Sequence, residues 1–185
     1  MPSSDLPFYY WDACVPLSYI NGVPDRLQHI DAFMSKSGTD FQLVTSVLSI
    51  TEVAFAAFEK QNDSLDAETE AKISKLWQAG SPIKIVEFYE LIAMRAQRLM
   101  RDALSNKWSL KPADAIHIAT ADQLKVAEFH TYDERLHKFS ALTETKFPIG
   151  PPISATPHLP LVAAAVDPAP IVTQPGNESS ASMKE

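Results

Sequence analysis

Residues 111–121 have the sequence KPADAIHIATA, and this stretch decides the fold that we expect. Pro112 is typical of the first turn of a helix. The helix that it opens continues to about Lys125 and carries apolar residues on nearly every face, so it should be buried at the centre of the domain. Its first turn also holds an acidic residue, Asp114.

Segments of strand and helix character alternate along the rest of the sequence. Short apolar or aromatic runs predict strands at residues 8–14, 41–47, 83–88 and 128–132. Helical spacing of apolar residues predicts helices around residues 27–34, 48–60, 66–79 and 92–103, with a short helix from Asp133 to Phe139, whereas Pro16 and Asn21–Gly22 predict turns. Strands separated by helices indicate an α/β fold with a mainly parallel sheet covered on both faces.

The composition changes near Phe147. Residues 148–185 hold eight of the 14 prolines and two of the five glycines of the chain. Such a mixture cannot bury enough apolar surface to offset the conformational entropy of the chain. We therefore expect one folded domain at residues 1–147 and a mostly disordered tail at residues 148–185.

Length, composition and charge limit the functions that the chain can have. With 185 residues, 45% of them hydrophobic, it is long enough for one sizeable core. No signal-peptide pattern and no apolar stretch of about 18 residues occurs, so we expect a cytoplasmic protein without a membrane span. The single cysteine, Cys14, excludes an internal disulfide and a thiolate metal site. A net charge of −7 repels polyanions, so binding of nucleic acid would depend on metal ions and a local basic patch.

Four acidic residues stand where strands end or helices begin: Asp12, Glu52, Asp114 and Asp133. In a parallel sheet these points meet at one edge, where ligands bind. Four carboxylates held together raise one another's pKa, and hard cations with oxygen ligands, such as Mg²⁺ or Mn²⁺, remove that cost. The pattern therefore predicts a metal-dependent enzyme that acts on phosphate esters, with RNA as the favoured substrate.

Each of these acids also has a purely structural interpretation, which the sequence leaves open. Asp12 can close an Asx-turn after its strand, and Glu52 can complete a capping box with Ser49. Asp114 lies in a first helical turn, where the macrodipole favours an anion. Asp133 can be the N-cap of the helix that follows it.

Basic and histidine residues near the acids have two interpretations as well. Lys107 and Lys111 flank Trp108 just before the Asp114 helix, and Arg95, Arg98 and Arg101 recur along the preceding helix. They form either a path that contacts RNA phosphates, with Trp108 stacking on a base, or an ordinary helix surface with Trp108 in the core. His117 and His130 have no partner at zinc-ligand spacing, so we interpret them as packing or hydrogen-bonding residues.

Four segments of the chain resemble the four conserved blocks of PIN-domain nucleases, including the VapC-type toxins of bacterial toxin–antitoxin pairs. They are YYWDAC, TSVLSITEVAF, KPADAIHIATA and FHTYDERLHKF, and together they span about residues 8–140. The resemblance implies a three-layer α/β/α sandwich. Asp12, Glu52, Asp114 and Asp133 match the metal-site acids of that family, and Ser46 and Thr131 match small polar residues often found beside them. The sequence lacks the glycine usual before the last strand and the Asp-Phe pair usual after the fourth acid.

The resemblance also implies a function, namely hydrolysis of single-stranded RNA by water bound to one or two Mg²⁺ or Mn²⁺ ions. Asp12, Asp114 and Asp133 would hold the metal, and Glu52 would bind it or orient the water. In-line attack would leave a 5′-phosphate and a 3′-hydroxyl. We expect an endoribonuclease, the toxin of a toxin–antitoxin pair with a cognate antitoxin protein, that forms a homodimer. The alternative is a catalytically inactive PIN-fold module for RNA binding or assembly.

Overall fold

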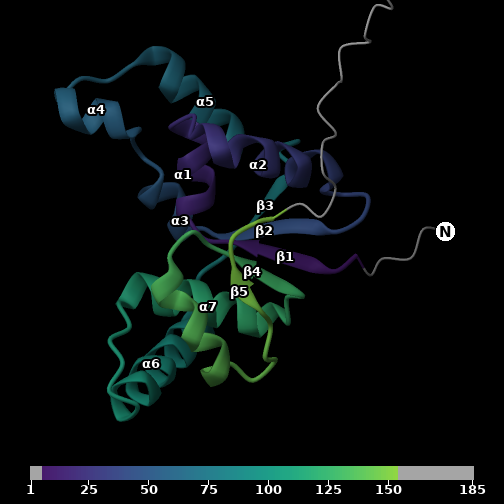
Figure 1. The fold of residues 1–185 in the computed structure, drawn as a ribbon, viewed down its shortest axis with the longest axis vertical. Helices are drawn as coiled ribbons and strands as arrows, with labels where there is room; N and C mark the ends of the chain where they lie inside the picture. Colours follow the sequence, from purple (N-terminus) through teal and green to yellow (C-terminus); the bar gives the residue numbers. More distant parts are fainter. Residues whose placement is uncertain (1–5, 154–185) are drawn as a thin grey trace, which may run out of the picture. The chain divides into compact units, whose positions relative to one another are not determined.

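Five parallel strands form one central sheet in the computed structural model, which describes residues 6–153. Their order in the sheet is β3-β2-β1-β4-β5 (Figure 1). The strands are β1 (Phe8–Trp11), β2 (Gln42–Ser46), β3 (Ile83–Val86), β4 (Glu128–His130) and β5 (Ile149–Gly150). Trp11 pairs with His130, and His130 pairs with Gly150, so the carboxyl ends of three strands lie side by side. The predicted parallel sheet is confirmed.

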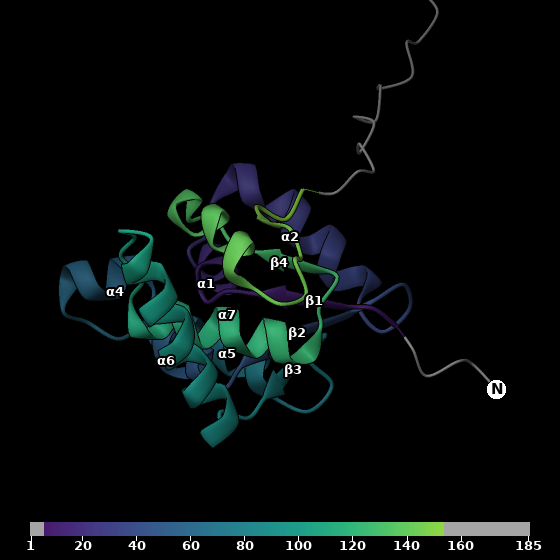
Figure 2. The ribbon, with the colours of Figure 1, turned by 90° about the horizontal axis from the view of Figure 1, so that it is seen from below.

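Helices cover both faces of this sheet, because successive strand residues point to opposite sides. Tyr10 and Val44 belong to one buried cluster, whereas their neighbours Trp11 and Leu43 belong to another. The first cluster is covered by α6 (Glu90–Ser105), α7 (Pro112–Leu124) and the 3₁₀ helix η1 (Glu134–Leu142), and the second by α1 (Cys14–Ile20), α2 (Pro24–Lys36) and α5 (Ala67–Trp77). Figure 2 shows α6 and α7 in the first of these layers. The predicted α/β/α sandwich is therefore confirmed.

The structure corrects the expected turn at Pro16 and confirms the one at Asn21–Gly22. Residues 14–20 form helix α1, in which Pro16 lies in the first turn. A proline is tolerated there because the first helical N–H groups have no intrahelical partner. Val15 and Ile20 on this helix are buried. The predicted turn at Asn21–Gly22 follows this helix, and Gly22 has a φ of 62° there.

The expected single helix at residues 48–60 is two short helices, α3 (Leu48–Glu52) and α4 (Ala57–Asn62). Val53 and Ala56, between them, are fully buried. The carboxylate of Glu59 accepts a hydrogen bond from the backbone of Ala56 (2.8 Å) and another from the backbone of Asp66 (2.8 Å). These bonds help to start a new helix at Ala57, with Ala56 as its N-cap. Glu52 is therefore the last residue of a short helix and not part of the first turn of a long one.

The sheet continues past the composition boundary at Phe147. The carbonyl of Pro148, just before β5, accepts from the Phe129 amide at 2.9 Å, and that of Gly150 in β5 accepts from the Thr131 amide at 2.8 Å. Ile149 is buried. The predicted boundary is therefore too early, because a two-residue strand is invisible in the composition of a long proline-rich segment. The rest of the predicted tail, residues 154–185, lies outside the described residues.

No helix within residues 6–153 is long and apolar enough to cross a membrane.

Candidate functional site

Asp12 lies where β1 and β4 end side by side. Its backbone N–H donates to the carbonyl of His130 (3.0 Å), which continues the pairing of the two strands by one residue. Its side chain is buried, with 7% of its residue surface exposed. Carboxylate atom Oδ2 accepts from the Thr131 hydroxyl at 2.8 Å and from the Cys14 thiol at 3.1 Å. The two polar neighbours thus fix the orientation of the Asp12 carboxylate and leave Oδ1 without a hydrogen bond from within residues 6–153.

Asp114 lies in the first turn of α7, two residues after Pro112. Burial raises the pKa of its carboxyl, and the negative charges of Asp12 and Asp133 raise it further, against smaller opposing effects of His117 and Lys111. No side chain or backbone group of residues 6–153 donates a hydrogen bond to this carboxylate. Asp12 and Asp133 therefore lie near enough to Asp114 for their charges to repel it, and His117 and Lys111 offset this repulsion only in part.

Glu52 reaches the same region from the end of α3. Its Oε2 lies 2.6 Å from Nε2 of His117 on α7, and the same nitrogen lies 3.8 Å from Oδ1 of Asp12. The Glu52 side chain is one third exposed. The predicted capping box between Ser49 and Glu52 is absent, since the Ser49 hydroxyl contacts the hydroxyl of Thr45 (2.6 Å) instead.

Asp133 is the N-cap of η1 and is held by Arg135. Its Oδ1 accepts from the Arg135 backbone N–H at 3.0 Å, which confirms the predicted capping role. The guanidinium of Arg135 also binds both carboxylate oxygens, with Nε 2.8 Å from Oδ1 and 3.1 Å from Oδ2. These hydrogen bonds lower the pKa of Asp133. A cation at this carboxylate would have to compete with Arg135.

The predicted auxiliary residues occupy different positions. The Thr131 hydroxyl donates to Asp12 and accepts from the backbone N–H of Asp133 at 3.0 Å, so it joins two of the acids. Ser46 is fully buried and contacts none of the four carboxylates. Its hydroxyl accepts from the Leu48 amide at 3.3 Å, at the start of α3.

Two residues near the acids were not predicted as site residues. His117 contacts Glu52, and its position three residues after Asp114 on one helix was the available signal. Cys14 contacts Asp12, from which it is two residues away in sequence. Burial and the charge of Asp12 raise the pKa of the Cys14 thiol to about 12, so this side chain acts as a neutral donor.

The basic residues divide between structural and site-proximal roles. Arg95 forms ion pairs with Asp122 and Glu144, which ties α6 to α7 and to the loop before β5. Trp108 packs edge-on against Phe139, with ring centroids 5.7 Å apart, as the core interpretation predicts. Arg98, Arg101 and Lys107 are exposed. Lys111 is exposed beside the site, and its charge lowers the pKa values of Asp114 and Asp133.

The donor set fits a hard divalent cation, although the side chains are not arranged to hold one as they stand. Within residues 6–153, no group of three or more His, Cys, Asp or Glu side chains forms a ready metal site. The carboxylate oxygens are nevertheless of the type that Mg²⁺ and Mn²⁺ prefer, and a cation would relieve the charge of Asp114. At Asp133 a cation would have to displace Arg135, which binds both carboxylate oxygens.

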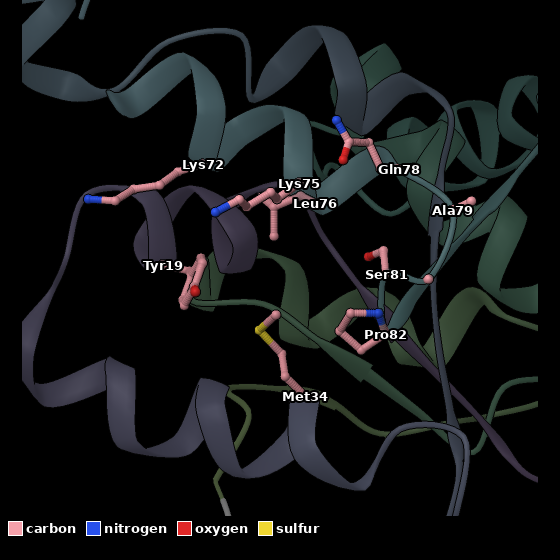
Figure 3. A pocket seen from close by; sticks show the side chains of 10 residues that line it. Tyr19, Met34, Lys72, Lys75, Leu76, Gln78, Ala79, Ser81 and Pro82 are labelled. Atoms are coloured by element: carbon pink, nitrogen blue, oxygen red, sulfur yellow. The ribbon is translucent and has the colours of Figure 1, made fainter. Parts of the chain in front are cut away.

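A separate cavity of about 530 Å³ lies on the α1, α2 and α5 side of the molecule (Figure 3). Tyr19, Met34 and Leu76 provide apolar lining, and Lys72 and Lys75 from α5 lie at one side. None of the four acids lines it.

A family model described as the PIN domain matches residues 9–142 of the chain. Solved structures share this fold at low sequence identity. VapBC2 from Rickettsia felis, bound to a promoter DNA fragment, has a TM-score of 0.56 at 10% identity, and the alignment covers 77% of this chain and 96% of the other. FitAcB from Neisseria gonorrhoeae has a TM-score of 0.56 at 16% identity, with coverage of 78% and 97%. A toxin–antitoxin complex from Klebsiella pneumoniae has a TM-score of 0.50 at 18% identity, with coverage of 79% and 98%. No curated protein sequence gives a significant match.

Proposed function

Because this chain belongs to the PIN-domain family, whose members are generally nucleases, we propose that it is a metal-dependent endoribonuclease that cleaves single-stranded RNA. The observation that supports the proposal is the half-buried Asp114 carboxyl, whose pKa is raised by burial and by the charges of Asp12 and Asp133 and only partly lowered by His117 and Lys111. A buried carboxylate near two others destabilises a fold, and a bound cation removes that cost. A structural role explains Asp133 as a cap, and the helix dipole favours an anion at Asp114, but neither explains why Asp114 lies near two further carboxylates.

The proposed roles of the residues follow from their positions. Asp12 and Asp114 would hold Mg²⁺ or Mn²⁺, with Asp133 joining after it leaves Arg135, and Glu52 would bind the ion or orient the attacking water. The bound ion would lower the pKa of water and stabilise charge on the attacked phosphate. Thr131 holds the Asp12 carboxylate in one orientation. The protein is acidic overall, so the phosphates of a substrate need local positive charge. Lys111 would supply it, and Arg135 would do so after it leaves Asp133.

We further propose that the chain is the toxin of a toxin–antitoxin pair. The structural neighbours with this fold include toxin–antitoxin complexes. The cavity between α1, α2 and α5 suits an antitoxin segment that presents apolar and acidic side chains, because its apolar lining adjoins Lys72 and Lys75. The adjacent gene is then expected to encode a small DNA-binding protein that co-purifies with this chain. Replacement of Lys72 and Lys75 by Glu should weaken that complex.

A homodimer is the proposed state of the free protein. Four large apolar residues follow β3 and remain exposed in the single chain: Phe88, Tyr89, Leu91 and Met94. A second copy would cover them, since exposed clusters of such residues mark interfaces. Light scattering of the wild type and of Met94→Glu tests this proposal, because the substitution should shift the protein towards a monomer.

The rival proposal is a PIN-fold module that binds RNA or assembles complexes without cleaving. It is less well supported, because a chain without catalysis has no need to keep Asp114 in an unfavourable position. Incubation of a labelled single-stranded RNA with Mg²⁺ or with EDTA separates the two proposals. We expect cleavage by the wild type, loss of cleavage with EDTA, and loss with Asp114→Asn. Asp25→Asn is the matched control, because Asp25 also follows a proline in a first helical turn, on α2. Cleavage by a folded Asp114→Asn protein would contradict the site assignment.

A further inference from the structure

A chain of hydrogen bonds connects β2, β1 and α7 to Glu52 on α3. The backbone N–H of Ser46 on β2 donates to the hydroxyl of Tyr10 on β1 at 3.0 Å. That hydroxyl lies 2.7 Å from Nδ1 of His117 on α7, and Nε2 of His117 lies 2.6 Å from Oε2 of Glu52 on α3. Tyr10 and His117 are almost completely buried, at 0% and 1% exposure.

The donors and acceptors of this chain can all be satisfied in one direction. The backbone N–H of Ser46 donates to the Tyr10 oxygen, and we assign the Tyr10 hydroxyl hydrogen to Nδ1 of His117, 2.7 Å away. Nδ1 of His117 is then an acceptor, which places the ring proton on Nε2, and Nε2–H donates to the Glu52 carboxylate. Burial raises the pKa of Tyr10 well above its ordinary value, so the hydroxyl keeps its hydrogen.

Glu52 depends on this contact for its orientation. It ends a five-residue helix, and its carboxylate accepts no other hydrogen bond from within residues 6–153. A glutamate side chain with three rotatable bonds loses considerable entropy when it is fixed, so a single rigid donor decides where it lies. The same nitrogen of His117 faces Oδ1 of Asp12 at 3.8 Å, so the histidine also sets the spacing between the two acids.

We propose that His117, held in one tautomer by Tyr10, is a positioning residue that fixes the Glu52 carboxylate beside Asp12 for a divalent cation or its water. This inference rests on the proposed function. It adds two buried residues to the four acids of the site, namely Tyr10 on β1 and His117 on α7. The support resembles in kind the outer hydrogen bonds that orient metal ligands, whose loss typically weakens metal binding about 10- to 100-fold.

The test measures Mn²⁺ affinity by calorimetry with the full-length protein. His117→Leu removes the donor and should weaken binding about 10-fold or more. His117→Gln retains an amide N–H near the position of Nε2 and should stay within a fewfold of the wild type. In a Glu52→Gln background, His117→Leu should cause no further loss, whereas a purely structural role would weaken binding equally in both backgrounds. His130→Leu is the matched control, because His130 is an equally buried histidine that pairs with Glu128.

A second readout does not depend on metal. The ¹⁵N spectrum of the histidine rings should show His117 protonated at Nε2 and not at Nδ1, and Tyr10→Phe should abolish that preference and weaken Mn²⁺ binding. If His117→Leu does not fold, Tyr10→Phe alone decides the question. Normal Mn²⁺ binding by a folded His117→Leu or Tyr10→Phe protein, or an Nδ1–H tautomer, overturns the positioning role. Absence of Mn²⁺ binding by the wild type overturns the proposed function itself, even where the tautomer is as expected.

Discussion

Arg135 binds both carboxylate oxygens of Asp133, two residues before it in the chain. The guanidinium occupies the carboxylate that a metal ion would need, and it compensates a charge that otherwise adds to the repulsion at Asp114. The Arg135 side chain is 72% exposed, so this ion pair is weak and can be exchanged. In the metal-free protein the Arg135 guanidinium therefore supplies the positive charge at Asp133.

Replacement of Arg135 by Gln should tighten Mn²⁺ binding, because the ion no longer competes with a guanidinium for Asp133. Exposed ion pairs contribute at most about 1 kcal/mol, so the dissociation constant should fall by about fivefold or less. Calorimetric titration with MnCl₂ measures the change. Lys138→Gln is the control for the general loss of one positive charge on η1. Weaker binding by Arg135→Gln than by Lys138→Gln would show that Arg135 supports the cation site and does not compete with it.

Replacement of Asp114 by Asn should leave the metal-free protein as stable as the wild type or more stable at pH 7. The folded-state pKa of Asp114 is raised, so the folded protein holds this proton more tightly than the unfolded chain does. The associated stability is present at pH values below the ordinary pKa of 3.8 and is lost as the pH rises through the raised folded-state value. Thermal melting from pH 3.5 to pH 7 should therefore show the advantage of Asp114→Asn growing with pH, with about 2–4 °C for each kcal/mol.

Asp25→Asn provides the comparison for this experiment. Asp25 lies in the first turn of α2 and is exposed, so its replacement removes a favourable interaction with the helix dipole and relieves no repulsion. A small loss of stability is expected for it at pH 7. If Asp114→Asn loses stability to the same extent, the dipole dominates at both positions, and the proposed repulsion at Asp114 is too small to matter. Mn²⁺ should raise the melting temperature of the wild type and of Asp25→Asn but not that of Asp114→Asn.

The positions of Asp12 and Asp114 in the fold are predictable, because they depend on where β1 ends and where α7 begins. The apolar runs at residues 8–14 and 128–132 marked β1 and β4, and parallel pairing then brings Asp12 and Thr131 together. Pro112 marked the start of α7 and with it the position of Asp114. Apolar runs and helix-starting prolines are signals within a short stretch of sequence. The positions of β1, β4 and the start of α7 can therefore be predicted from the sequence.

The support of the site was not predictable, because it depends on contacts between residues far apart in sequence. His117 and Glu52 are 65 positions apart, and their contact requires α3 to end at Glu52. That helix ends because Val53 is buried and because Glu59 starts the next helix, both consequences of tertiary packing. The strand at residues 149–150 is likewise stabilised by β4 and has no periodicity of its own.

Replacement of Glu59 by Ala should destabilise the protein by about 1–3 kcal/mol, because two backbone N–H groups lose their acceptor. Glu59 itself is 4% exposed, so water does not readily replace the lost bonds. Glu59→Gln keeps one acceptor oxygen and should cost less. Urea denaturation measures both changes. Equal stability of Glu59→Ala and the wild type would show that the segment after α3 is held by apolar packing alone.

Truncation of the chain separates the role of β5 from that of the residues beyond it. A protein that ends at Ile153 keeps β5 and all four acids, and the proline-rich composition of residues 154–185 predicts little effect of their loss on melting temperature or Mn²⁺ binding.

A protein that ends at Phe147 loses the buried side chain of Ile149 and the acceptors of the Phe129 and Thr131 amides. It should melt several degrees lower. It should also bind Mn²⁺ more weakly, because Thr131 orients the Asp12 carboxylate and is itself held by Gly150. Equal behaviour of the two truncated proteins would mean that β5 does not support the site, and a large loss on truncation at Ile153 would mean that residues 154–185 contribute to the folded body.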